Sequence, residues 1–176
     1  MHLLLQGSLE VICGPMFSGK TEELIRRVRR AQIARQKIQV FKPMIDNRYD
    51  KEKIVSHSSL SIDSHPVNNP LEILTKLLDS TRVIAIDEVQ FFDQQIVKVI
   101  LKLVRRGHRV IVAGLDLDYL GKPFGHMPEL LALADEVTKV AAVCTVCGNK
   151  ASKTQRLYLD DGLLSTQEQI LINPIR

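Results

Sequence analysis

The chain has 176 residues, of which 45% are hydrophobic and 25% are charged, and its formal net charge is +4. This fits one soluble globular domain with, at most, a small appendage. The weak positive charge suits phosphate-bearing ligands, but no basic tail or basic-aromatic repeat indicates a nucleic acid partner. Three cysteines do not form a disulfide framework, and neither a signal peptide nor an apolar run of about 20 residues occurs. We therefore expect a cytoplasmic protein without membrane contact.

The first part of the chain alternates between short apolar runs and helical periodicity. Residues 9–13 are a short apolar run that predicts a buried strand. A glycine-rich stretch at residues 14–21 follows, and apolar residues then recur at helical spacing. Residues 38–41 predict a second strand, which Pro43 ends. Residues 44–69 are polar and irregular, so we expect an excursion with short strands.

The middle of the chain continues the same alternation. Residues 70–78 predict a helix, and residues 83–86 predict a third buried strand. Asp93 starts a very apolar helix with a cationic last turn and a glycine cap. Residues 110–113 predict a fourth strand. The loop at residues 114–127 holds three glycines and a proline, and loops of that length are often functional.

These elements predict an α/β fold with a parallel sheet and right-handed crossovers, of the RecA-like P-loop type. A last strand is expected at residues 136–140. From Cys144 onward the pattern changes to a cysteine knuckle and short polar strands. We therefore divide the chain into a P-loop nucleotide-binding domain at residues 1–140 and a small lobe at residues 141–176.

Residues 14–21 (the phosphate loop) fit the P-loop pattern in full. Glycines let successive backbone N–H groups turn toward phosphate oxygens, and the following helix points its positive end at the same anion. Lys20 reaches the β- and γ-phosphates, and the Thr21 hydroxyl ligates Mg²⁺ in such loops. The alternative is a chance glycine turn, which the preceding strand and the following helix disfavour. The pattern therefore indicates binding of a nucleoside triphosphate.

Asp87 and Glu88 directly follow the third strand, at the end of the strand where α/β sheets bind ligands. P-loop enzymes need an acidic residue near Mg²⁺ at such a position, and Asp87 is the natural choice. Glu88 is the candidate to accept a proton from an attacking hydroxyl. The alternative is a solvated turn or a helix cap. The loop and these acids do not identify the acceptor, because ATPases, GTPases, recombinases and small-molecule kinases share them.

Five motifs together resemble type II (cytosolic-type) thymidine kinases, and the resemblance runs from about Leu9 to Leu157. The motifs are residues 14–21, Asp46-Asn47-Arg48-Tyr49, residues 87–92, Lys122-Pro123-Phe124-Gly125 and Cys144-Thr145-Val146-Cys147. The resemblance implies a kinase that transfers the ATP γ-phosphate to the 5′-hydroxyl of thymidine in nucleotide salvage, with deoxyuridine as a further substrate. ATP and Mg²⁺ are the implied cofactors.

The resemblance also implies roles for individual residues. Glu88 matches the catalytic base, and Lys20, Arg48 and Asp46 complete the catalytic set. The implied ATP and phosphate contacts are Gly14, Pro15, Met16, Phe17, Ser18, Gly19, Lys20, Thr21, Asp87 and Gln90, of which Thr21 and Asp87 hold Mg²⁺. Without the resemblance, a plain turn with a surface ion pair would be the preferred interpretation of Asp46 and Arg48.

The implied thymidine contacts are Met16, Phe91, Leu115, Tyr119, Phe124, Thr154 and Arg156. Aromatic and thioether side chains form a flat apolar slot for a pyrimidine ring. Each of them alone would be interpreted as a core residue or a chance exposed aromatic. Residues 114–125 match the family's substrate-wrapping loop, called the lasso, and Tyr119 stands where relatives often carry phenylalanine.

The family's lasso lobe binds a structural zinc through two CxxC pairs, because a small lobe lacks a core of its own. This chain has Cys144 and Cys147, but neither cysteine nor histidine follows Arg156. Three explanations are open: a truncated chain, zinc bound with an upstream histidine or a neighbouring subunit, or loss of zinc.

The resemblance further implies a homotetramer and feedback by thymidine triphosphate (dTTP). Two other functions remain open at this point. The first is a RecA-like module acting on nucleic acid, which would show strongly salt-dependent DNA binding. The second is a nucleotide-binding protein without catalysis.

Overall fold

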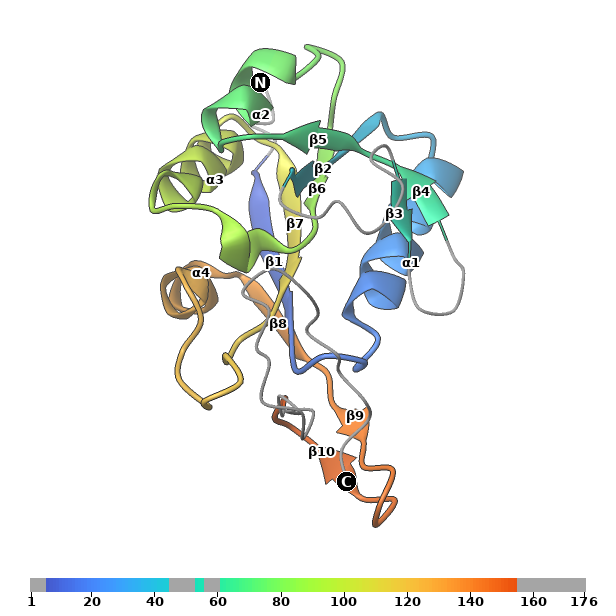
Figure 1. The fold of residues 1–176 in the computed structure, drawn as a ribbon. Helices are drawn as coiled ribbons and strands as arrows, with labels where there is room; N and C mark the ends of the chain where they lie inside the picture. The colour runs from blue at the N-terminus through green and yellow to red at the C-terminus, as the bar shows by residue number, and fades with distance from the viewer. Residues whose placement is uncertain (1–5, 45–52, 56–60, 155–176) are drawn as a thin grey trace.

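A computed structural model of the chain describes residues 6–44, 53–55 and 61–154, with the backbone alone at 53–55. Its centre is a six-stranded sheet in the order β5-β2-β6-β7-β1-β8 (Figure 1). Every pairing within this sheet is parallel, which confirms the predicted parallel α/β fold. The strands are β1 (Ser8–Cys13), β2 (Ile38–Pro43), β5 (His65–Val67), β6 (Val83–Ile86), β7 (Arg109–Gly114) and β8 (Glu136–Lys139).

Helices cover both faces of the sheet. Helix α1 (Lys20–Ile33) lies on one face, and α2 (Leu71–Lys76), α3 (Gln95–Arg105) and α4 (Met127–Leu133) lie on the other (Figure 1). Helix α3 was predicted to start at Asp93, and the Asp93 carboxylate accepts a hydrogen bond from the Gln95 backbone N–H at 2.9 Å. This contact satisfies one of the backbone donors that a helix leaves free at its N-terminus.

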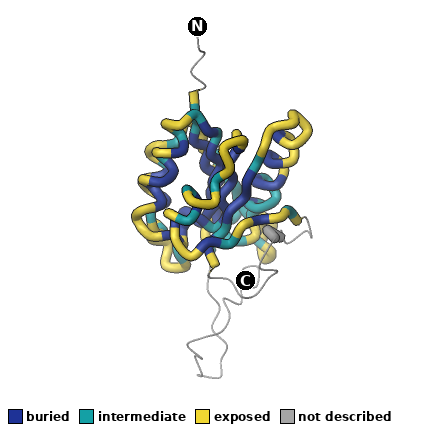
Figure 2. The backbone as a smooth tube through the Cα atoms, turned by 90° about the horizontal axis from the view of Figure 1, so that it is seen from above, coloured by how far each residue is buried: buried dark blue, intermediate teal, exposed yellow. Residues whose placement is uncertain are grey.

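Side-chain alternation along the strands separates the interior into two apolar clusters. On the α1 face, Ile12 of β1 packs with Leu24, Ile25 and Val28 of the helix. On the opposite face, the neighbouring strand positions pack against α3 through residues such as Ile100. Burying one such side chain contributes about 1.5–3 kcal/mol, so the strands are held mainly by what they bury (Figure 2).

Several elements differ from the sequence-based expectation. Helix α4 was not predicted, because it has seven residues and two turns of apolar periodicity are too few to recognise. The short 3-10 helix η1 (Val89–Phe91) was also missed. The expected excursion after β2 contains an antiparallel pair, β3 (Lys53–Val55) and β4 (Ser61–Asp63).

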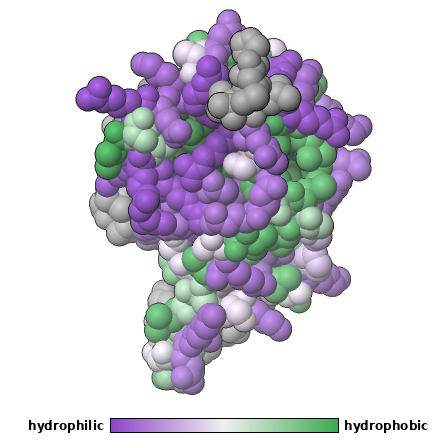
Figure 3. Space-filling view, turned by 180° about the vertical axis from the view of Figure 1, so that it is seen from behind, coloured by the Kyte–Doolittle hydropathy of each residue, from purple (hydrophilic) through white to green (hydrophobic). Residues whose placement is uncertain are grey.

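The predicted change of pattern near Cys144 corresponds to a hairpin of β9 (Ala142–Val143) and β10 (Lys150–Ala151). This hairpin projects from the body of the molecule beyond the end of β8 (Figure 1). Seen from behind, the body above the hairpin is largely hydrophilic, with hydrophobic side chains along one flank (Figure 3). Within the described part of the chain, no helix is both long and apolar enough to span a membrane.

The sheet order determines where the candidate residues meet. Strand β7 lies between β1 and β6, so a single strand separates the phosphate loop after β1 from Asp87 after β6. Because all three strands are parallel, the segments that follow them lie at the same edge of the sheet. This is the edge at which open α/β sheets bind ligands.

Candidate active site

The phosphate loop connects β1 directly to α1, as its pattern predicts. Lys20, which is 8% exposed, donates a hydrogen bond from Nζ to the Pro15 carbonyl oxygen at 2.7 Å. Ser18 donates to the same oxygen from its hydroxyl at 2.6 Å. Burial lowers the pKa of Lys20, although the charges of Glu88 and Asp87 oppose that shift. The lysine is thus held beside the loop, where a phosphate oxygen can replace the carbonyl as its acceptor.

Thr21 and Asp87 join the start of α1 to the end of β6. The Thr21 hydroxyl donates to Oδ2 of Asp87 at 3.2 Å. Burial, and then the charge of Glu88, raise the pKa of Asp87 to about 7. A hydroxyl and a carboxylate beside a phosphate cradle fit Mg²⁺, which takes few protein oxygens and completes its octahedron with substrate phosphates and water. The structure thus brings together the two residues that the sequence assigns to Mg²⁺, and their role as metal ligands stays a prediction.

Glu88 has a left-handed backbone, with φ 52° and ψ 38°. Residues other than glycine rarely adopt this conformation, and such strain concentrates at functional sites. Its backbone N–H donates to Oδ1 of Asp87 at 3.0 Å. Its side-chain Oε2 accepts a hydrogen bond from Nε2 of Gln90 at 2.5 Å. The Asp87 carboxylate is thus held by Thr21 and the Glu88 N–H, and the Glu88 carboxylate by Gln90. These separate contacts allow one acid to bind the metal and the other to accept a proton.

An aromatic pair lies next to these acids in the chain. Phe91 and Phe124 meet edge to face, with ring centroids 5.6 Å apart and planes at 83°. Phe91 remains 38% exposed, and Tyr119 is also exposed, whereas Leu115 is buried. Exposed aromatic rings beside polar groups are typical of a site for a ring-bearing ligand.

The other predicted thymidine contacts include Met16 in the phosphate loop and Thr154 beyond β10. The structure brings these two together, because the Met16 backbone N–H donates to the Thr154 hydroxyl at 3.0 Å. Asp46, Arg48 and Arg156 lie outside the described residues. Their assigned roles therefore stay predictions.

One charged pair at this edge was not predicted from the sequence. Asp116, which is 5% exposed and follows β7, forms an ion pair between Oδ2 and Nζ of Lys139 at 2.7 Å. The Asp116 backbone oxygen accepts a hydrogen bond from the Phe124 N–H at 3.0 Å, which links the pair to the aromatic residues. The rule that indicated Asp87, an acid just after a strand, applies equally to Asp116 and could have found it.

The hairpin cysteines do not complete a zinc site. The backbone N–H of Gly148 donates to the Cys144 carbonyl at 2.8 Å, which forms the expected knuckle turn. Cys144 and Cys147 are free thiols. Among residues 6–44, 53–55 and 61–154, no group of three or more metal-binding side chains occurs. Because a structural zinc needs four ligands, these two thiols alone do not fit it.

A family model described as thymidine kinase matches residues 7–173, which is nearly the whole chain. The chain belongs to the thymidine kinase family. The resemblance noted in the sequence is therefore confirmed, and with it the kinase class of the enzyme. Membership implies ATP, Mg²⁺ and thymidine as ligands. It also disfavours the RecA-like nucleic acid module and the nucleotide-binding protein without catalysis.

Proposed function

We propose that the protein transfers the γ-phosphate of ATP to the 5′-hydroxyl of thymidine, yielding thymidine monophosphate for nucleotide salvage. One observation carries the proposal: the hydrogen-bonded pair Thr21 and Asp87 joins the phosphate loop to the strand end where Glu88 and Phe91 also lie. A phosphate cradle, a candidate base and an aromatic surface thus share one edge of the sheet.

The phosphate loop binds the triphosphate through its backbone N–H groups and the N-terminus of α1. The loop residues in this role are Gly14, Pro15, Met16, Phe17, Ser18 and Gly19. Lys20 leaves the Pro15 carbonyl and places its charge on the β- and γ-phosphates. Thr21 and Asp87 hold Mg²⁺, which when bound neutralises charge on the transferred group.

Glu88 is the proposed general base, accepting the proton of the thymidine 5′-hydroxyl as it attacks the γ-phosphorus. From their place in the family motif, Asp46 and Arg48 complete the catalytic set, with Arg48 offsetting charge on the phosphoryl group. The thymine ring packs among the apolar and aromatic residues. These are Met16, Phe91, Leu115, Tyr119 and Phe124, with Thr154 and Arg156 near the thymine methyl group.

Family membership supports further proposals on assembly, location, regulation and domain division. The chain assembles as a homotetramer in the cytoplasm, and dTTP inhibits it. The division at residues 140 and 141 separates the catalytic domain from a lobe that closes over the nucleoside. The thiols of Cys144 and Cys147 alone would not hold a structural zinc. Light scattering on purified protein tests the assembly, and mass spectrometry on the same sample measures its zinc.

The direct test is ATP-dependent phosphorylation of thymidine by the purified chain, compared with deoxyuridine. Glu88→Gln should lower kcat by about 10²- to 10⁴-fold, the contribution typical of a general base. Lys98→Gln, an exposed change in α3, is the control and should leave kcat unchanged. Protein that binds ATP but leaves thymidine unmodified would refute the substrate assignment, and full activity in Glu88→Gln would refute the base.

A further inference from the structure

Gln90 lies two residues after Glu88, in the 3-10 turn η1, and it is 3% exposed. A buried amide has two donors and one acceptor group to satisfy, and leaving them unpaired is costly. The sequence assigns Gln90 to the ATP contacts, but the structure gives both ends of its amide partners inside the protein. Those partners indicate a different role.

One end of the amide faces the candidate base, and the other faces the loop at residues 114–125. Nε2 donates to Oε2 of Glu88 at 2.5 Å, while Oε1 accepts from the Leu115 backbone N–H at 3.1 Å. The chemistry fixes this orientation, because a carboxylate oxygen only accepts and a backbone N–H only donates. If the amide were flipped, two donors would face each other at Leu115 and two acceptors would face each other at Glu88.

Two glycines enclose Gln90, one at each end of the same loop. A Cβ atom on Gly114 would lie 2.6 Å from Oε1 of Gln90, and one on Gly125 would lie 2.6 Å from its backbone oxygen. At Gly125 the neighbour is backbone, so glycine is required there, whereas a side chain at Gly114 would displace the Gln90 amide. Both ends of the loop therefore pack directly on Gln90.

We propose that Gln90 is a positioning residue that orients the Glu88 carboxylate. This orientation depends on the packing of the 114–125 loop against Gln90. The hydrogen bond to Oε2 fixes the carboxylate plane and leaves Oε1 of Glu88 to face the substrate hydroxyl. The bond from Leu115 holds the amide only when the loop stem is in place. The Glu88 carboxylate is thus aligned with the substrate hydroxyl only when the loop that carries Phe124 is packed against Gln90. This inference rests on the proposed function of Glu88.

A double-mutant cycle tests whether Gln90 acts through Glu88. Gln90→Met keeps the length of the side chain and removes both hydrogen bonds. We expect it to lower kcat about 10- to 100-fold, with the KM for ATP unchanged, because small misplacements of a catalytic group have effects of that size. In the Glu88→Gln background the same change should alter kcat less than about twofold, since the base is already lost. Additive losses would overturn the proposal.

A matched control separates positioning from stability. Gln39 in β2 is also buried, and its amide bonds the Lys76 oxygen, the Leu78 N–H and the Thr81 hydroxyl, on a different part of the sheet. Gln39→Met should lower the melting temperature about as much as Gln90→Met does. Its kcat, divided by the number of sites that bind ATP, should stay at the wild-type value. If Gln39→Met lowers kcat per site as much as Gln90→Met, a structural role explains both results and the proposal fails.

Hydrogen exchange gives a readout that does not depend on the substrate. Gln90→Met should speed amide exchange at Leu115 and along residues 114–125, whereas Gln39→Met should not. Unchanged exchange there would refute the tie between Gln90 and the loop. Absence of thymidine phosphorylation in the wild-type protein would instead refute the proposed function, so the two failures are distinguishable.

Discussion

At the scale of single residues, Glu88 has a left-handed backbone, as Phe17 of the phosphate loop also does. Its left-handed conformation disfavours any side chain with a Cβ atom, by about 1 kcal/mol. Glu88→Gly and Glu88→Ala both remove the carboxylate, so their difference isolates the backbone. We expect Glu88→Gly to have the larger free energy of unfolding, by about 1 kcal/mol, in urea titrations. Both variants should be inactive.

The control for this comparison is Lys98, an exposed residue inside α3. There glycine should be less stable than alanine by about 1 kcal/mol, the reverse order, because the helix backbone suits alanine. Equal stabilities of the two Glu88 variants would show that the strain is absent in solution.

Asp87 predicts a pH dependence of the free protein. Its pKa is raised to about 7, so the folded state holds a proton between about pH 4 and pH 7 that the unfolded chain has already released. The folded state is therefore stabilised below this window, and that stabilisation is lost as the pH rises through it. Asp87→Asn removes the effect.

Calorimetry without Mg²⁺ or nucleotide measures this loss. The melting temperature of wild-type protein should fall relative to that of Asp87→Asn between pH 5 and pH 8. If the melting temperatures of the two proteins change with pH in the same way across that range, the folded protein does not hold a proton on Asp87.

Sequence alone predicted Lys20, Thr21, Asp87 and Glu88 because each role depends on a short local pattern. The contacts of Gln90 could not be predicted in this way. Its partner Leu115 is 25 positions away, and nothing local to either residue indicates their hydrogen bond. The ion pair of Asp116 and Lys139 is of the same kind, since it joins the ends of two different strands.

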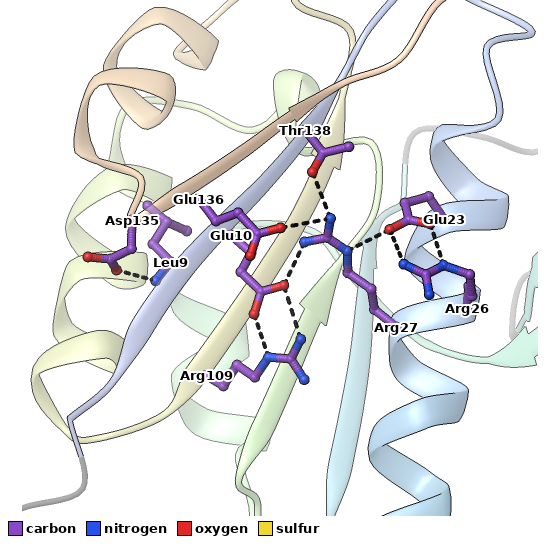
Figure 4. A network of polar contacts seen from close by, with 9 residues as sticks. All are labelled: Leu9, Glu10, Glu23, Arg26, Arg27, Arg109, Asp135, Glu136 and Thr138. Atoms are coloured by element: carbon purple, nitrogen blue, oxygen red, sulfur yellow. Dashed lines mark hydrogen bonds and ion pairs between the residues drawn. The ribbon is translucent and has the colours of Figure 1, made fainter.

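At the scale of elements, β1 carries a carboxylate inside an otherwise apolar strand. Glu10 accepts hydrogen bonds from Arg27 of α1 at 2.6 Å and from Arg109 of β7 at 2.5 and 3.1 Å (Figure 4). Arg27 also bonds Glu23 and Thr138. This network connects α1 to the three strands β1, β7 and β8. It also lines a polar hollow of about 270 Å³.

Glu10→Gln should weaken this connection in a pH-dependent way. Burial alone raises the pKa of Glu10, but hydrogen bonds from Arg109 and Arg27 outweigh it and leave the pKa below its usual value. Its stabilising contribution is therefore present above about pH 4 and is lost as the pH falls through the lowered pKa. We expect a loss of about 2 kcal/mol in the free energy of unfolding at pH 7, and a smaller one at pH 3.

Glu23→Gln is the comparison, because Glu23 pairs with the exposed Arg26 as well as with Arg27. Pairs that face solvent contribute less, so its loss should stay below about 1 kcal/mol at pH 7. If Glu10→Gln costs no more than Glu23→Gln at any pH, the network does not hold the helix to the sheet.

The elements themselves were predictable where burial and length were sufficient. Strand β6 is a continuous apolar run, and β1 and β7 are mostly apolar, because both faces of these strands are buried. Helix α4 fails that condition, since Met127 and Leu130 alone are buried along its seven residues. Its helical state depends on packing against the sheet, which a local pattern does not reveal.

At the scale of the whole molecule, the site is assembled from segments spread over almost the entire chain. The phosphate loop, Glu88, the 114–125 loop and Thr154 follow four different strands. The alternation of strands and helices predicted a parallel sheet, but not that β7 would lie between β1 and β6. Strand order depends on long-range pairing, so the meeting of these segments required the structure.

The longest of these connections is the hydrogen bond from the Met16 N–H to the Thr154 hydroxyl, across 138 positions. It joins the segment after the hairpin to the phosphate loop, so we expect it to couple the proposed nucleoside contacts to the proposed phosphate contacts. Thr154→Val keeps the shape of the side chain and removes the acceptor. A lost hydrogen bond of about 1 kcal/mol should raise the KM for thymidine about fivefold.

Thr154→Ser keeps the hydroxyl and loses the methyl group, so it separates the two contributions. If the bond to Met16 matters, Thr154→Ser should stay within about twofold of the wild-type KM for ATP, while Thr154→Val should raise that KM as well. If the methyl group alone matters, Thr154→Ser should weaken thymidine binding and both variants should bind ATP normally. Steady-state kinetics with each substrate varied in turn distinguish these outcomes, and the second would show that the phosphate loop does not depend on the hairpin segment.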